Sequence, residues 1–391
     1  MSEKVNTMEE LDDNPLAALE GVGVEDIESL KKTTGLNYEN YISIPKSEAL
    51  PIMRVLDSLS KIASDSYAKN LCISTEGKFI VFRYNNAPYL FEYRIENRTG
   101  HSIEAVSIPI NHIRKLLNNV NTNLIFVQED GQINVCLGEN LLFVETMPFD
   151  KKYYDFNFKE CAEGLDLPYM KDHLRSFSAL LSATNNASEK NLICKDGVSY
   201  FNAGAILGKA KSFFGNHQVV ISKIVLDAVS ALVDETKSGI LMNIDGSKMT
   251  LEFAGLAKCE FPVTTDPATF DTFLSPLFVD SFKYDNSVLV VNESLRQLLQ
   301  VINAMDYFTS FVKIEFKESE FVLTAHRKEG GPIEYNFKYL EGAANVSTIN
   351  VGIPVLLAVL NKANNSTKYS TSTGNLIVDL GTVTFCIRSN S

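Results

Sequence analysis

One pattern recurs six times from about Tyr41 to the end of this chain: a short apolar strand, an amphipathic helix and three further strands. Alternating or continuous runs of β-branched and aromatic residues, bounded by Glu-Gly, Asp-Gly and Asn turns, predict the strands. A repeated unit constrains the fold more than any single element, because each copy has to bury its apolar face against a neighbour. In the first copy we expect strands at 42–45, 70–74, 78–84 and 89–95 and a helix at 47–64.

The other five copies follow at even spacing. Their helices are predicted at 111–120, 169–184, 223–235, 293–305 and 353–364, each followed by three strands. Segments 150–165 and 266–276 read as linkers between pairs of copies. The sequence therefore predicts an α+β protein of three tandem domains, each holding two βαβββ units, at 41–155, 165–275 and 278–391.

The charge of the chain is unevenly distributed. The formal net charge is −12, but residues 1–40 hold ten acidic residues and only three lysines, which leaves 33 basic and 38 acidic residues in the body. A nearly neutral body can still present a basic surface, so the net charge does not exclude binding to nucleic acid. We expect 1–40 to be an acidic N-terminal extension.

Several classes of protein are disfavoured by what the sequence lacks. It has no apolar run long enough to span a membrane and no apolar core of a signal peptide near its start. Six scattered cysteines suggest reduced thiols in a cytoplasmic protein. No nucleotide-binding, metalloprotease or serine-hydrolase motif occurs, and the five histidines share no spacing. We therefore expect a protein that is not an enzyme, without metal or cofactor.

The repeat resembles that of the bacterial and phage β-type DNA sliding clamps over about residues 41–391. Two stretches of local sequence also resemble this family, VSIPINHIRKLLNNV at 106–120 and STINVGIPVLLAVLNKA at 347–363. The resemblance implies outer antiparallel sheets, inner helices and a head-to-tail homodimeric ring. Such a ring would encircle double-stranded DNA without sequence specificity and tether the replicative polymerase. The lack of Trp and the Asn-rich body favour a phage source, in the cytoplasm of an infected host, over a bacterial one.

A ring that slides has to attract phosphates without reading bases, and cations on the lining helices would do this. Acidic neighbours such as Asp57, Asp172 and Asp227 weaken the pattern. Taken one at a time, these helices are better explained as ordinary solvated faces, and only their equivalent places in six repeats favour contact with DNA. The candidates are Arg54, Lys61, Arg114, Lys115, Lys171, Arg175, Lys223, Arg296 and Lys362.

The resemblance also implies an apolar groove that takes short peptides from the polymerase and the clamp loader. Plain core packing is the alternative for each of its residues. The chain ends in CIRSNS, unlike the Met/Pro-containing tail of bacterial clamps, so the accepted peptide would differ as well. The groove residues implied by repeat position are Ile206, Leu207, Pro262, Phe385 and Ile387.

Two readings remain open beside the clamp. The chain could be a diverged clamp-like interaction protein, such as a viral factor that recruits transcription machinery without encircling DNA, or a DNA-modifying enzyme whose site leaves no motif. The N-terminal extension has a short helix-hairpin-helix outline at 19–36, where glycines would let the backbone approach a phosphate. Its acidic residues favour a solvated tail or a partner-binding helix instead.

Overall fold

The computed structural model describes residues 40–62, 69–120, 123–129, 132–137, 140–147, 149–182, 191–202, 204–266, 268, 270, 274, 280–284, 286–363 and 365–389. The acidic extension and its helix-hairpin-helix outline lie outside the described residues. The chain divides into two compact units. The first holds the described residues within Met1–Leu56, Ala63–Asn86 and Phe91–Phe156, and the second those within Asp57–Ile62, Ala87–Leu90 and Asn157–Ser391.

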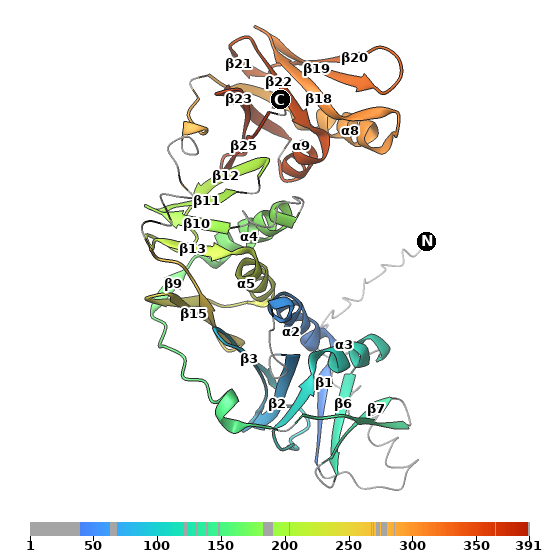
Figure 1. Ribbon diagram of the computed structural model, residues 1–391, viewed down its shortest axis with the longest axis vertical. Helices are drawn as coiled ribbons and strands as arrows, with labels where there is room; N and C mark the ends of the chain where they lie inside the picture. The colour runs from blue at the N-terminus through green and yellow to red at the C-terminus, as the bar shows by residue number, and fades with distance from the viewer. Residues whose placement is uncertain are drawn as a thin grey trace, which may run out of the picture. The chain divides into compact units, whose positions relative to one another are not determined.

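Two copies of the repeated pattern make up most of the first unit, although the end of α2, η1 and the start of β4 are assigned to the second (Figure 1). Its first helix ends at Leu59 and continues as a short 3-10 turn, η1. The first copy consists of β1 (Tyr41–Pro45), α2 (Lys46–Leu59), η1 (Ser60–Ile62), β2 (Asn70–Glu76), β3 (Phe79–Asn86) and β4 (Tyr89–Glu96). The second consists of β5 (Val106–Pro109), α3 (Ile110–Asn119), β6 (Asn123–Glu129), β7 (Gln132–Leu137) and β8 (Asn140–Val144), followed by η3 (Lys151–Tyr154).

The two copies of the first unit exchange their opening strands. Strand β1 pairs antiparallel with β6 of the second copy, with Ile42 opposite Phe126, and β5 pairs with β2 of the first copy, with Leu71 opposite Ile108. Among the strands of these two copies, the orders are therefore β1-β6-β7-β8 and β5-β2-β3-β4. Each copy thus supplies one edge to the sheet of the other, so neither sheet is complete without both copies.

The second unit repeats this arrangement twice. Its first pair of copies consists of β9 (Glu163–Leu165), α4 (Leu167–Ser182), β10 (Asn191–Lys195), β11 (Val198–Asn202), β12 (Ile206–Lys211), β13 (Val219–Ser222), α5 (Lys223–Glu235), β14 (Ile240–Asp245), β15 (Lys248–Phe253) and β16 (Ala257–Pro262). Strand β9 pairs with β14 and β13 with β10. Because β9 lies at the end of segment 150–165, that segment is more than the linker we expected: it carries the opening strand of the third copy.

The last pair of copies consists of β17 (Val288–Val291), α8 (Asn292–Ala304), β18 (Phe308–Phe316), β19 (Glu320–Arg327), β20 (Ile333–Lys338), β21 (Glu341–Gly342), β22 (Ser347–Gly352), α9 (Ile353–Leu360), β23 (Ser366–Ser372), β24 (Asn375–Asp379) and β25 (Val383–Ile387). Here β17 pairs with β23 and β22 with β18. Helix α9 ends at Leu360, and Asn361 forms its C-cap. The helix is thus four residues shorter at this end than predicted.

Pairing of β12 with β25 joins a group of four strands to a group of five, giving one nine-stranded sheet of order β13-β10-β11-β12-β25-β24-β23-β17-β21. The junction aligns Ile206 with Ile387, Leu207 with Cys386 and Gly208 with Phe385. It therefore brings together residues about 180 positions apart in the sequence, including four of the five predicted groove residues.

The helices bury the apolar faces that their sequences predict. Ala49, Met53, Leu56 and Leu59 of α2 are buried, as are Met170, Leu174 and Phe177 of α4. Within the second unit α4 contacts α5 and α8 contacts α9, as Figure 1 shows. Burying such faces against a sheet supplies most of the stability of a short helix. The fold is α+β, built from antiparallel sheets, and none of the described helices is both long and apolar enough to cross a membrane.

Candidate functional site

The candidate cations of α2 and α3 lie on faces that the buried apolar residues leave outside. Arg54 is exposed between the buried Met53 and Val55, and Lys61 is exposed on η1. On α3, Lys115 is exposed, whereas Arg114 is half-buried and donates a hydrogen bond of 2.9 Å to Oδ1 of Asn111. The helix faces predicted from the sequence are thus present, with Arg114 held against its own helix.

Two candidate cations in the second unit already have partners within the protein. Nζ of Lys171, on α4, donates to the carbonyl oxygen of Thr236 at 2.5 Å, and Lys223 forms an ion pair with Asp227 one turn along α5. Arg296 is half-buried on α8, and Lys362 is exposed just after α9. The side chain of Arg175 lies outside the described residues. Among the candidates whose side chains are described, Arg54, Lys61, Lys115 and Lys362 are exposed.

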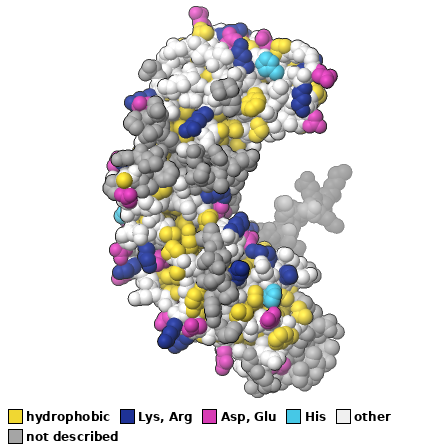
Figure 2. Space-filling view, in the orientation of Figure 1, with side chains coloured by type: hydrophobic (Ala, Val, Ile, Leu, Met, Phe, Trp, Pro, Cys, Tyr) yellow, Lys and Arg dark blue, Asp and Glu magenta, His cyan; other side chains and the backbone are white. Residues whose placement is uncertain are grey.

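Lys46 was not among the sequence candidates, although it plays a role parallel to that of Lys171. It opens α2 and donates from Nζ to the carbonyl oxygen of Val120, the C-cap residue of α3, at 2.8 Å. Carbonyls at a helix C-terminus lack partners within the helix, so an ammonium group stabilises them. Figure 2 shows lysines and arginines interspersed with acidic side chains on the face in view. Lys46 and Lys171 thus both hold the C-terminal end of a neighbouring helix.

Four of the five predicted groove residues lie at the β12–β25 junction, on both of its faces. Gly208 faces the helix side, because a Cβ there would lie 2.2 Å from the ring of Phe201, which packs against Phe177 of α4. Phe385 lies opposite Gly208, and its ring centroid is 6.3 Å from that of Phe201. Side chains alternate along a strand, so Ile206 and Ile387 share this buried, helix-facing side.

Leu207 alone among the predicted groove residues faces the other side of the junction. It forms a buried cluster with Cys386 and Ile377 of the neighbouring strands and with Phe282. We name this face, defined by Leu207, Ile377 and Cys386, the junction face. Pro262, the last predicted groove residue, is half-buried at the end of β16, which belongs to another sheet.

An open cavity of about 460 Å³ adjoins the junction face. Two lysines of β12, Lys209 and Lys211, border it together with Phe282 and Tyr284. The hydroxyl of Tyr284 donates to Oδ2 of Asp379 at 2.9 Å, and burial raises the pKa of Tyr284 to about 12. The cavity combines aromatic walls with a basic rim, which suits a peptide that carries apolar and acidic side chains. It is also lined by Gly197, Val198, Ala210, Thr382 and Thr384.

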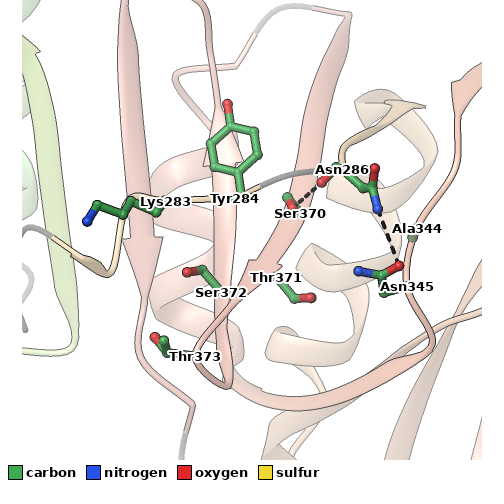
Figure 3. Close-up of a pocket in the computed structure, with 9 residues that line it drawn as sticks. All are labelled: Lys283, Tyr284, Asn286, Ala344, Asn345, Ser370, Thr371, Ser372 and Thr373. Atoms are coloured by element: carbon green, nitrogen blue, oxygen red, sulfur yellow. Dashed lines mark hydrogen bonds between the residues drawn. The ribbon is translucent and has the colours of Figure 1, made fainter.

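A second cavity, of about 230 Å³, lies beside β23 (Figure 3). Its wall is made of small polar residues, among them Asn286, Asn345 and Ser370. Asn286 donates from its side chain to Oδ1 of Asn345 at 3.3 Å, and Ser370 donates to the backbone oxygen of Asn286. These three residues of the wall therefore bond to one another within the protein.

The described residues hold no group of three or more His, Cys, Asp or Glu side chains placed to bind a metal ion. All six cysteines are buried and form no disulfide. Burial raises the pKa of the Cys194 thiol to about 11, and that of Cys386 is likewise raised to about 11. A thiolate nucleophile needs a lowered pKa and access to solvent, so these thiols have the character of core residues.

The fold is that of the DNA polymerase sliding clamps. Solved structures with this fold include the DNA polymerase III beta subunit of Thermotoga maritima, at 13% sequence identity and a TM-score of 0.69, and the sliding clamp of Bacillus subtilis, at 10% and 0.69. A Caulobacter crescentus beta sliding clamp, with PEG bound to a putative beta-motif tethering region, matches at 11% and 0.68. Each match covers 90% of this chain and 99% of the other. No protein-family model and no curated protein sequence matches this chain.

Proposed function

We propose that this protein is a DNA sliding clamp: a ring that encircles duplex DNA without sequence specificity and tethers the replicative polymerase. The observation that carries the proposal is the likeness to clamp structures over 90% of this chain and 99% of theirs. A partial likeness could reflect one borrowed domain, whereas this one includes all six copies of the repeated unit. In this proposal the chain has three clamp domains, at 41–155, 165–275 and 278–391, and no enzymatic activity.

Exposed cations on the helices support the DNA-binding part of the proposal. Arg54 and Lys115 project from α2 and α3 of the first unit, and Lys362 follows α9 of the second. Contacts of lysine and arginine with phosphates are independent of base sequence, which sliding requires. In this role Arg54, Lys61, Arg114, Lys115, Arg175, Arg296 and Lys362 contact the DNA backbone, while Lys171 and Lys223 act mainly within the protein.

Free sheet edges with exposed apolar side chains support a head-to-tail homodimer. Strand β8 is the last strand of its sheet, and its Phe143 is 58% exposed. Strand β20 ends another sheet, of order β20-β19-β18-β22, and Tyr307 and Phe311 at the start of β18 are also exposed. An unpaired edge is a template for pairing with a second chain. Joining β8 of one copy to β20 of the next would close a ring of two chains.

The polymerase and the clamp loader are proposed to dock through short peptides at the junction face and its adjoining cavity. Leu207 lies on that face, whereas Ile206, Phe385 and Ile387 support it from behind. Apolar anchors in such a site bind weakly enough to exchange between clients. The proposed setting is the cytoplasm of a bacterium or a phage-infected cell.

Retention on circular DNA tests the proposal directly. The protein is loaded on nicked circular plasmid with the loader of its host, and the complex is separated by gel filtration before and after the plasmid is linearised. A clamp stays on the circle and leaves the linear ends, and light scattering gives the mass of a dimer. Equal retention on both forms would contradict sliding, and no retention on either would favour the clamp-like interaction protein. Phe143→Asp should give monomers, whereas Val346→Asp, at another exposed apolar residue, should leave the dimer intact.

A further inference from the structure

The junction face is already covered by side chains from this same protein. They come from the described residues within 266–284, a segment whose first part, 266–276, is predicted from the sequence to be a linker. Phe270 is buried to 1% exposure and Phe282 to 8%. The backbone N–H of Leu274 donates to the carbonyl oxygen of Phe270 at 2.7 Å. Two phenylalanines buried to this degree are core residues and not features of a solvated linker.

These side chains cover adjoining parts of one sheet. Phe282 packs on Leu207, Ile377 and Cys386, across the β12–β25 junction. Phe270 packs on Ile193 and Val220, of β10 and β13. Leu274 and Tyr200 contact both clusters. The three apolar side chains Phe270, Leu274 and Phe282 therefore follow the sheet from β13 to β24, and we call them the covering triad.

Polar bonds fix the end of the segment beside the junction. The side chain of Ser281 forms a hydrogen bond with the thiol of Cys386. Tyr284 bonds to Asp379, which ends β24, and the N–H of Lys283 donates to the carbonyl oxygen of Asp280 at 3.0 Å. Apolar contacts of the triad with the sheet add to these bonds.

We propose that the covering triad is an internal ligand of the junction face, which a client peptide has to displace in order to bind. The inference rests on the proposed function, because it assigns regulation to the peptide site of the clamp. The triad offers what a client peptide would offer, a few aromatic and aliphatic side chains spaced along an extended apolar surface. The open cavity bordered by Lys209, Lys211 and Phe282 adjoins the triad. An incoming peptide can therefore make its first contacts in this cavity, before the triad is displaced.

The apparent affinity of a competing peptide is its affinity for the free site multiplied by the fraction of time that the site is free. Clients that engage only the apolar face would therefore bind weakly, whereas clients with acidic residues gain contacts to the lysine rim and compete better. The triad thus selects among clients by their charge as well as by their apolar side chains.

Alkylation of Cys386 reports whether the face is covered. In the wild-type chain Cys386 is fully buried beneath Phe282, and N-ethylmaleimide should modify it slowly. In the double variant Phe270→Ala/Phe282→Ala the rate at Cys386, followed by mass spectrometry, should rise at least tenfold. Cys194 serves as the internal control, because it alternates with Ile193 on β10 and so faces away from the triad. Its rate should stay low, and Val346→Ala should change neither rate.

A fluorescent peptide of residues 266–284, added in trans, tests ligand behaviour. It should bind the double variant at least tenfold more tightly than the wild type and restore the protection of Cys386. Equal affinity for both proteins, or no restored protection, would overturn the inference. If Cys194 also reacts in the double variant, the milder variant Leu274→Ala is used in place of the double variant. A severalfold rise in the alkylation rate is then expected at Cys386 alone. No rise in that variant would overturn the inference as well.

Failure of the internal-ligand proposal can be distinguished from failure of the proposed clamp function. A wild-type protein retained on circular DNA, combined with an unchanged Cys386 rate in the variants, contradicts only the internal ligand. A protein that circular DNA does not retain, but whose Cys386 responds as expected, contradicts only the clamp.

Discussion

Nζ of Lys171 lies 2.5 Å from the carbonyl oxygen of Thr236, so a lysine on α4 closes the C-terminal end of α5. Thr236 is the C-cap residue of that helix, and the hydroxyl of its side chain also bonds back to the carbonyl oxygen of Leu232. Lys46 and Val120 repeat this relationship between α2 and α3. In both pairs of helices, a positive charge that resembles a DNA contact is used to hold two helices together.

Lys171→Met should therefore reduce stability more than it reduces binding to DNA. Loss of a charged hydrogen bond at a helix C-terminus should cost about 1–2 kcal/mol. We expect a lower thermal midpoint and an unchanged salt dependence of DNA retention. Lys115→Met, at an exposed position on α3, should show the opposite pattern. If Lys171→Met altered only the salt dependence, the capping role would be wrong.

Charge reversal at Arg54, Lys115 and Lys362 together should abolish retention on circular DNA. Each cation that contacts a phosphate contributes about 0.9 to the steepness of log affinity plotted against log salt concentration. Each of the three single charge reversals should therefore make that slope less steep. Circular dichroism should remain that of the wild type. The matched control reverses Lys317, Lys328 and Lys368, which are exposed in strands or loops outside the helices. Equal losses in both triple variants would point to net charge instead of a binding surface.

Gly208→Ala should destabilise the second unit strongly. The added methyl group would lie 2.2 Å and 2.5 Å from two ring carbons of Phe201, whose ring is held by Phe177. Overpacking of this kind costs about 1–3 kcal/mol, and this contact is severe enough for the upper end. Chemical denaturation measures the loss. Gly239→Ala is the control, because a Cβ there meets nothing within 4 Å, and a comparable loss in both would contradict the steric explanation.

Glu76 should make stability depend on acid pH. Its hydrogen bonds from Arg83, at 2.5 Å and 3.0 Å, hold its pKa below the ordinary 4.5, against the raising effect of partial burial. A carboxylate with a lowered pKa in the folded state adds stability above its unfolded pKa and loses it as pH falls through the folded value. Glu76→Gln should therefore cost about 0.5 kcal/mol at pH 7, the scale of a half-exposed ion pair, and progressively less below pH 4.5.

Thermal midpoints measured at pH 7, 5 and 4 show whether the difference in stability between the wild type and Glu76→Gln shrinks as the pH falls. Glu318→Gln, at an exposed position in the β18–β19 turn, should run parallel to the wild type throughout. A difference between the wild type and Glu76→Gln that grew on acidification would reverse the sign and contradict the ion pair with Arg83.

The repeated pattern predicted the elements well because periodicity is a local property. Helix α5 matches its predicted bounds of 223–235, and the apolar faces of α2 and α3 are buried as expected. The sequence does not reveal which strand a given strand pairs with, so the exchange of β1 and β5 was not foreseen. Strand β9 was missed because only three residues, Glu163–Leu165, form it.

The site was harder to predict, since it depends on contacts between distant residues. Whether a lysine is free or capping a helix depends on its neighbour in space, as Lys171 and Thr236 illustrate. At the junction a shift of one residue changes the face: Phe385 and Ile387 lie behind it, whereas Cys386 lies on it. The covering triad had a visible signal, because the apolar Phe270 and Leu274 fall within the predicted linker 266–276 and Phe282 follows it closely.

The exchange of opening strands has a consequence for the origin of the chain. A solitary βαβββ copy would have a sheet of three strands with its fourth strand projecting away, unable to close on itself. Two such molecules could satisfy each other only by trading those arms, as domain-swapped dimers do. The chain has the layout that would result from joining swapped partners end to end and repeating the joined pair three times in all. Any truncation that splits a pair would leave an orphaned arm prone to aggregation.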